Sequence, residues 1–192
     1  MYKIAVIVGS LRQNSLNHRL AKALEALSGS RFEFDFVEIG DLPLYNDDLW
    51  QNPPAAALRL KRQVEEADGV LFVTPEFNRS IPAALKNAIE WGSRPWGKNS
   101  WGGKPASIIG TSPGNIGTAA AQLALRSIAV HLDMIVLGQP EIYFVSKPGL
   151  IGDDYEVTDD TTREFLEGYL ARFESFIAQV GEREPQRQRR AA

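Results

Sequence analysis

The chain of 192 residues has no cysteine, only two histidines and no long apolar run. Without cysteine, it cannot form a disulfide, a thiolate nucleophile or a cysteine-bound metal site. The apolar run at residues 4–8 is too short for the apolar core of a signal peptide or for a membrane span. The sequence therefore predicts no membrane insertion, and the cytoplasm is the expected compartment.

The chain also lacks a strong excess of charge, since its formal net charge is -3 at pH 7. This value argues against a general nucleic-acid binder. With 44% hydrophobic and 23% charged residues, the composition fits one compact α/β domain, which we place at residues 1–181. Residues 182–192 carry four arginines and no large apolar side chain, which predicts a disordered basic tail. One short basic run is a weak sign of a nucleic-acid or membrane role.

Apolar runs rich in β-branched residues alternate with segments of helical periodicity. The predicted strands are residues 4–8, 32–39, 69–74, 106–110 and 134–137, with residues 142–145 as an alternative extension of the last strand. The predicted helices are residues 15–27, 55–66, 81–91, 115–132 and 161–180. This alternation predicts a parallel sheet with helices on both faces. Ligands of such sheets bind beyond the carboxyl ends of the strands, so the loops after the first, third and fourth strands are expected to form the site.

The first of these loops is GSLRQNSLN, residues 9–17, which leads into a helix. Free backbone N–H groups at a helix N-terminus favour an anion, usually a phosphate. Ser10 and Ser15 can donate hydroxyl hydrogen bonds, and Asn17 can donate its amide. Arg12 can neutralise phosphate charge. Neither GxxxxGK[ST] nor GxGxxG is present, which favours a mononucleotide over a dinucleotide. An ordinary turn capped by Ser15 is the alternative interpretation.

The second loop is TPEFNRSIP, residues 74–82. Pro75 restricts the backbone, and Asn78 suits a tight turn. Phe77 stands where a planar ligand would rest. Glu76 has two interpretations, a general base or a carboxylate with a turn or subunit contact. We favour the second, because no neighbouring residue forms an acid–base pair with it.

The third loop is GTSPGNIGT, residues 110–118, whose glycines allow a ligand to approach the backbone closely. Ser112 and Thr118 add hydroxyls. All three loops are expected at the same edge of the sheet. A phosphate site, a planar edge with an aromatic ring and a glycine wall together indicate flavin mononucleotide (FMN).

The motifs GSLRQNSLN, PEFNRSIPAALKNAIEW and TSPGNIGT resemble those of the NADPH-dependent FMN reductase family. Within that family the chain is most similar to bacterial quinone and chromate reductases and to related azoreductases. The similarity covers roughly Met1 to Phe176. It implies a flavodoxin-like, doubly wound sheet of five parallel strands in the order 2-1-3-4-5. The chain departs from the family at Phe77, where tyrosine is usual, which removes one hydrogen-bonding hydroxyl.

The resemblance also implies the residues that bind the cofactor. The phosphate would be held by Ser10, Arg12, Ser15, Leu16 and Asn17. The isoalloxazine would be lined by Pro75, Glu76, Phe77 and Asn78, with Ser112 nearby. Arg94 would face the substrate or the nicotinamide.

The reaction that the resemblance implies is hydride transfer from NADPH or NADH to flavin N5, followed by reduction of a quinone in a ping-pong scheme. Chromate, azo compounds and free flavin are other possible acceptors. Because the cofactor supplies this chemistry, we expect no catalytic side chain and no metal. Family members form homodimers or homotetramers in which a neighbouring subunit helps to wall the flavin.

Two other functions are compatible with FMN binding. One is a flavodoxin-like electron carrier that does not use NAD(P)H, although such carriers are usually strongly acidic. The other is a flavin-binding scaffold without turnover. His18 and His131 are expected on a helix surface or in the core rather than in catalysis. The tryptophans of residues 91–101 could wall the flavin or form a subunit interface, and both interpretations stay open.

Overall fold

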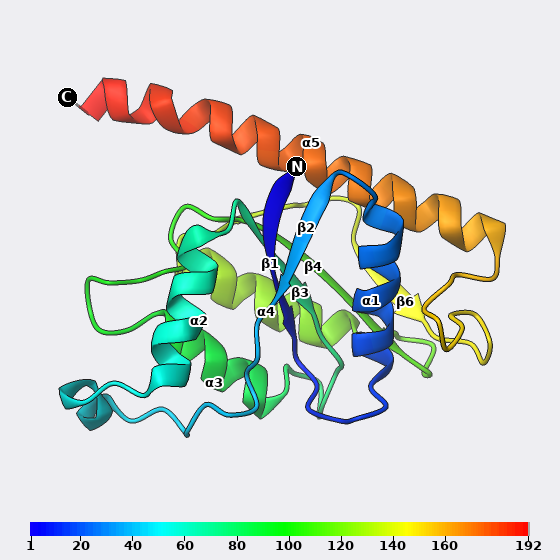
Figure 1. Ribbon diagram of the computed structural model, residues 1–192, viewed down its shortest axis with the longest axis horizontal. Coiled ribbons are helices and arrows are strands. Elements are labelled where there is room, and N and C mark those ends of the chain that lie inside the picture. The colour runs from blue at the N-terminus through cyan, green and yellow to red at the C-terminus, as the bar shows by residue number, and fades with distance from the viewer. Residues whose placement is uncertain (192) are drawn as a thin grey trace.

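The computed structural model describes the backbone of residues 1–191 and the side chains of residues 1–181. A parallel sheet forms the middle layer, and helices cover both of its faces (Figure 1). The strands are β1 (Tyr2–Val8), β2 (Phe32–Phe36), β3 (Gly69–Val73), β4 (Pro105–Ser112), β5 (Ile135–Val136) and β6 (Ile142–Val145). The helices are α1 (Leu16–Ser28), α2 (Ala55–Glu66), α3 (Ala83–Gly92), α4 (Ala119–His131) and α5 (Asp160–Ala191), with a short 3-10 helix, η1 (Asp47–Gln51).

The sheet has the order β2-β1-β3-β4-β5, which confirms the predicted flavodoxin-like topology. Its last position is shared by two short strands, because β5 pairs with the start of β4 and β6 pairs with the end of β4. The predicted extension of the last strand is therefore present, but as a separate strand. Gly138 and Pro140 lie between the two pieces, and proline has no N–H to continue a ladder.

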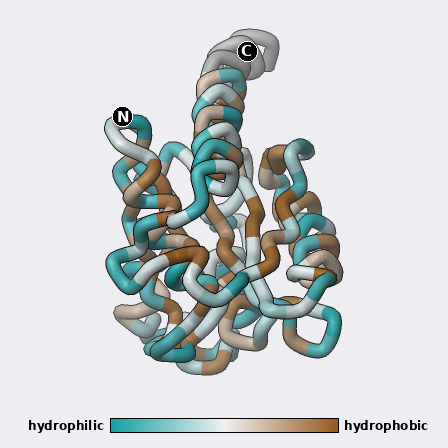
Figure 2. Tube along the Cα trace, turned by 90° about the vertical axis from the view of Figure 1, so that its right-hand side faces the viewer, coloured by the Kyte–Doolittle hydropathy of each residue, from teal (hydrophilic) through white to brown (hydrophobic). Residues whose placement is uncertain are grey.

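The strands are buried on both faces, as expected for a parallel sheet. Along β1, Ile4 and Val6 contact the core under α1 and α5, whereas Ala5 and Ile7 contact the core under α2, α3 and α4. Hydrophobic residues accordingly gather in the strands at the centre of the molecule (Figure 2). Burial of this apolar surface is the main stabilising contribution to the layered fold.

Several predicted boundaries differ from the structure. Helix α4 begins at Ala119 rather than at residue 115, because Gly117 has a φ of 62°, outside the helical region. Helix α3 begins after Pro82, whose backbone is extended. Helix α5 continues to Ala191, beyond the predicted end at residue 180. The side chains of the segment 182–192 lie outside the described residues, so the domain boundary at 181 and the disordered tail stay predictions. No helix in the described part of the chain is long and apolar enough to cross a membrane.

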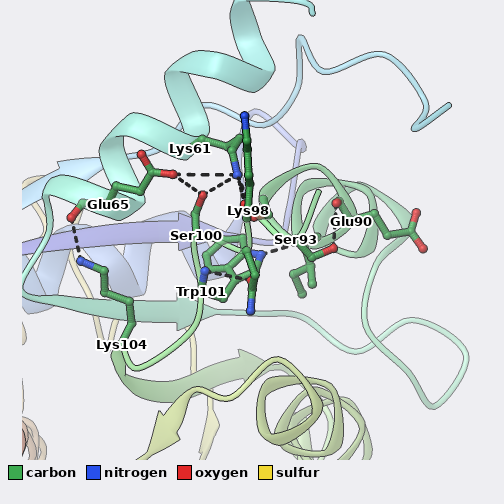
Figure 3. A network of polar contacts seen from close by, with 11 residues as sticks. Lys61, Glu65, Glu90, Ser93, Lys98, Ser100, Trp101 and Lys104 are labelled. Atoms are coloured by element: carbon green, nitrogen blue, oxygen red, sulfur yellow. Dashed lines mark hydrogen bonds and ion pairs between the residues drawn. The ribbon is translucent and has the colours of Figure 1, made fainter. Parts of the chain in front are cut away.

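A buried lysine holds the loop that follows α3. The Lys61 ammonium on α2 donates hydrogen bonds to the Lys98 carbonyl (2.6 Å), the Ser100 hydroxyl (2.6 Å) and the Gly92 carbonyl (3.3 Å) (Figure 3). Ser100 in turn donates to the Glu65 carboxylate at 2.6 Å. These contacts join α2 to the end of α3 and to the loop that leads into β4.

We expect Lys61→Ala to lower the free energy of unfolding by about 2 kcal/mol, because buried acceptors lose a charged donor. Urea unfolding measures this difference. Lys86→Ala is the control, because Lys86 forms an exposed ion pair with Glu90, and both residues lie on α3. Loss of this ion pair should lower the free energy of unfolding by no more than about 0.5 kcal/mol. Equal effects of the two changes would contradict the assigned role of Lys61.

Burial also lowers the pKa of Lys61 from its usual value of 10.5. The unfolded chain therefore binds this proton more tightly than the folded chain does. The contribution of Lys61 to stability accordingly increases as the pH rises from its folded pKa towards 10.5.

Candidate functional site

The loops after β1, β3 and β4 meet at the carboxyl edge of the sheet, as predicted. The Gly9 N–H donates to the Val73 carbonyl at 2.9 Å, and the Thr74 N–H donates to the Ile109 carbonyl at 3.0 Å. These backbone bonds continue the sheet into the first turn of each loop. Side chains then make the remaining connections.

Asn17 joins the first loop to the third. Its amide N–H donates to the Thr111 carbonyl, and its amide oxygen accepts from the Thr111 N–H, both at 2.9 Å. The side chain is buried, with 3% of the residue exposed. Asn17 was expected to donate its amide to a phosphate, but the amide binds the backbone of β4 in the structure. One amide hydrogen has no assigned partner among these contacts.

Glu76 joins the second loop to the third. Its Oε2 accepts from the N–H groups of Ala120 (2.9 Å) and Ala121 (3.2 Å), in the first turn of α4. Its Oε1 accepts from Arg79 at 3.2 Å. A carboxylate is favourable at a helix N-terminus, where the N–H groups are otherwise unpaired. This geometry agrees with a turn carboxylate and leaves Glu76 poorly placed as a general base.

The third loop packs closely against its neighbours because its glycines have no side chain. A Cβ at Gly110 would lie 2.1 Å from the Thr74 carbonyl oxygen and 2.3 Å from the Thr118 hydroxyl. The Ser112 hydroxyl donates to the Gly117 carbonyl at 2.7 Å. Glycine at position 110 therefore permits the close approach of the loops after β3 and β4.

The three loops enclose a cavity of about 250 Å³ at this edge of the sheet. Nine of the ten residues that the resemblance assigns to FMN line it, together with two others. The lining residues are Ser10, Arg12, Ser15, Leu16, Asn17, Pro75, Glu76, Phe77, Thr111, Ser112 and Pro113.

One end of this cavity has the features of an anion site. The Ser15 hydroxyl caps α1 by accepting from the His18 N–H at 3.2 Å. The N–H groups of Leu16 and Asn17, in the same first turn, have no intrahelical acceptor. The Arg12 side chain is exposed and makes no hydrogen bond or ion pair with other described residues. The capping and phosphate-binding interpretations of this loop are therefore compatible.

Thr111 and Pro113 were missed by the sequence analysis, although they flank Ser112 in the third loop. The Thr111 hydroxyl is buried and has no hydrogen-bond partner among the described residues. Such an orphaned hydroxyl beside a cavity suits a polar ligand that would complete its hydrogen bonding.

Two predicted site residues lie elsewhere. Asn78 is an exposed residue of the turn after Phe77. Arg94 follows the end of α3, and its charge acts on Tyr45: burial raises the pKa of the Tyr45 phenol, and Arg94 partly opposes that rise. Neither Asn78 nor Arg94 lines the cavity, so their roles stay predictions.

The histidines and tryptophans also lie outside the cavity wall. His18, on α1, packs against Phe36 of β2, and His131 ends α4. Trp91 and Trp101 are fully buried in the core, whereas Trp96 is 89% exposed. Of the three tryptophans in residues 91–101, only Trp96 is therefore available to a ligand or a subunit interface.

The cavity fits FMN in chemistry: a cationic, N–H-rich end suits the phosphate, and Pro75 to Phe77 with the third loop form walls for a flat ring. No group of three or more potential metal-ligating side chains occurs among residues 1–181.

Residues 2–148 match the sequence profile of the NADPH-dependent FMN reductase family. A 2-hydroxy-1,4-benzoquinone reductase of a Burkholderia species is 48% identical over 175 residues, which cover 91% of this chain and 96% of that protein. A quinone reductase of Pseudomonas putida is 45% identical over 178 residues, with coverage of 92% and 95%.

Among solved structures, the flavoenzyme FerB of Paracoccus denitrificans, an NAD(P)H:acceptor oxidoreductase, is 48% identical with a TM-score of 0.92. The match covers 94% of this chain and 99% of FerB. The chain therefore belongs to the NADPH-dependent FMN reductase family and is an NAD(P)H-dependent oxidoreductase with FMN as its cofactor.

Proposed function

We propose that the enzyme reduces quinones to hydroquinones with NAD(P)H, consuming one proton and releasing NAD(P)⁺. The observation that carries this proposal is the single cavity that gathers nine of the predicted FMN residues. The activities named for the Burkholderia and Pseudomonas putida relatives support a quinone as acceptor. Chromate, azo compounds and free flavin are secondary acceptors in this proposal. We place the enzyme in the cytoplasm, where NAD(P)H is supplied.

The phosphate of FMN would be held at the N-terminus of α1. The Arg12 guanidinium offers a charge-assisted hydrogen bond, and the N–H groups of Leu16 and Asn17 point along the helix dipole towards an anion. Ser10 and Ser15 supply hydroxyls at the same end. The buried Thr111 hydroxyl would find a partner in the polar chain of the cofactor.

The isoalloxazine would lie between the second and third loops. Pro75 and Phe77 supply apolar contact area, and Phe77 is 56% exposed at the mouth of the cavity. The Glu76 carboxylate is occupied by α4 and Arg79, so this residue holds the loop rather than moving a proton. Bound FMN supplies the redox chemistry, and the protein binds, orients and shields it.

In the proposed ping-pong order, NAD(P)H and the quinone enter the same cavity in turn. Purified protein is expected to show a flavin absorption spectrum that bleaches with NADPH under anaerobic conditions and returns with a quinone. Steady-state rates at several fixed quinone concentrations should give parallel double-reciprocal lines. A spectrum that NADPH and NADH leave unchanged would instead support an electron carrier, and absence of flavin after incubation with FMN would refute the site.

We expect Arg12→Ala to weaken FMN binding about 10- to 100-fold, because a charge-assisted phosphate contact contributes roughly 1.5–3 kcal/mol. Fluorescence titration of the apoprotein with FMN measures this dissociation constant. Arg62→Ala, which removes an exposed arginine from α2, is the matched control and should leave binding unchanged. Equal affinities for FMN in the two variants would remove Arg12 from the phosphate site.

We further propose a homodimer or homotetramer in which a second copy covers the cavity mouth. Phe77, Ile116 and Leu123 are each more than half exposed. Phe77 adjoins Glu76, which binds the N–H of Ala120, one helical turn before Leu123. Leu123→Asp is therefore expected to reduce the mass measured by sedimentation equilibrium. Phe165→Asp, on the opposite face of the sheet, should leave the mass unchanged, and a monomeric wild type would contradict the proposal.

A further inference from the structure

The turn after Phe77 has an arginine where a glycine would be less strained. Phe77 and Ser80 exchange two backbone hydrogen bonds of 3.0 Å, which closes a two-residue hairpin. Its central residues, Asn78 and Arg79, have φ values of 50° and 63°. Such turns favour Asn-Gly, because asparagine tolerates the left-handed region whereas long side chains rarely adopt it. Arg79 therefore occupies a backbone conformation that arginine disfavours, which indicates that its side chain has a function.

The Arg79 guanidinium is only partly paired. One Nη1–Oε1 contact of 3.2 Å joins it to Glu76, and the side chain of Arg79 is 69% exposed. The other oxygen of Glu76 accepts from the N–H groups of Ala120 and Ala121. The remaining guanidinium N–H groups have no partner among the described residues, so Arg79 retains the donors needed for an oxyanion.

Arg79 also stands beside the proposed flavin cavity. It lines a second cavity of about 240 Å³ together with Glu76, Ser112, Gly114, Asn115, Ile116 and Gly117. Glu76 and Ser112 line both cavities, so the two adjoin. Arg12 lines only the first cavity and Arg79 only the second. The site therefore carries a second cation, apart from the proposed phosphate end, in a chain whose net charge is -3.

We propose that Arg79 determines specificity by binding an oxyanion of a molecule that exchanges electrons at the flavin. This inference rests on the proposed function of the adjoining cavity. Two molecules carry suitable oxyanions: a quinone with an ionised hydroxyl group, and the nicotinamide dinucleotide with its phosphates. Either anion would accept two hydrogen bonds from the planar guanidinium, which selects it over a neutral analogue.

The test compares wild-type holoenzyme with Arg79→Gly and Arg79→Gln. The glycine variant suits the positive φ of the turn, so the loop keeps its fold without the cation. The acceptors are 2-hydroxy-1,4-naphthoquinone, which is an anion at neutral pH, and neutral 1,4-naphthoquinone. Each kcat/KM is divided by the wild-type value for the same quinone, so their different potentials cancel. Lys86→Gln, an equal loss of charge on α3 away from both cavities, is the control.

If the quinone is the anion, both Arg79 variants should lose about tenfold in kcat/KM with the hydroxyquinone and less than about twofold with the neutral quinone. Titration of the oxidised holoenzyme with the hydroxyquinone, followed by its flavin spectrum, should show the same loss of affinity. If the dinucleotide is the anion, the KM for NADPH should rise about tenfold with both quinones. A rise for NADPH alone, and not for NADH, identifies its additional phosphate.

Equal changes with all substrates, or no change relative to Lys86→Gln, would overturn the role of Arg79. A weakened dissociation constant for FMN would also overturn it, since Arg79 would then act through the cofactor. Failure of the proposed function is recognised separately, because wild-type enzyme would then not oxidise NAD(P)H with the neutral quinone either.

Discussion

The exchange of hydrogen bonds between the Asn17 amide and the backbone of Thr111 is the constraint on which the site depends. Strand β3 ends at Val73, which pairs with Ile109, so Thr111 has no strand beside it on that side. The Asn17 side chain takes the place of the missing strand. It thereby fixes the N-terminus of α1, and with it the proposed phosphate end of the cavity, against the third loop. Glu76 makes the equivalent connection between the second loop and α4.

The topology could be predicted because the first and third strands are continuous apolar runs, which are typical of a parallel sheet buried on both faces. Residues 4–8 and 69–74 are clear examples. Boundaries were less accurate where one residue overrides a periodic pattern. Residues 115–118 continue the small-residue pattern of α4, yet Gly117 has a positive φ and delays the helix. The last strand was divided because the segment GQPE, residues 138–141, separates two apolar runs.

The residues of the cavity could largely be predicted, whereas their contacts could not. Ser10 to Asn17 and Pro75 to Phe77 follow strands directly, so topology alone brings them to one edge. The two bonds of Asn17 and the orphaned hydroxyl of Thr111 depend on the register between segments 94 residues apart. Arg94 does not line the cavity, and its role stays a prediction. Arg94 lies near a site motif in the sequence. The loop that follows it is held against α2, because Lys61 donates to the Lys98 carbonyl and to the Ser100 hydroxyl.

The same contacts bear on how an enzyme whose chemistry is supplied by its cofactor can remain selective. Carboxylates near a flavin site would repel the phosphates of FMN and NAD(P)H, but the single carboxylate on the cavity wall is Glu76. Its charge is directed into the N-terminus of α4 and towards Arg79, so it faces N–H groups rather than the ligand. The balance of charge at the cavity then favours anions, although the chain as a whole is acidic. Selectivity thus follows from where the loops direct their charges, while the redox chemistry belongs to the cofactor.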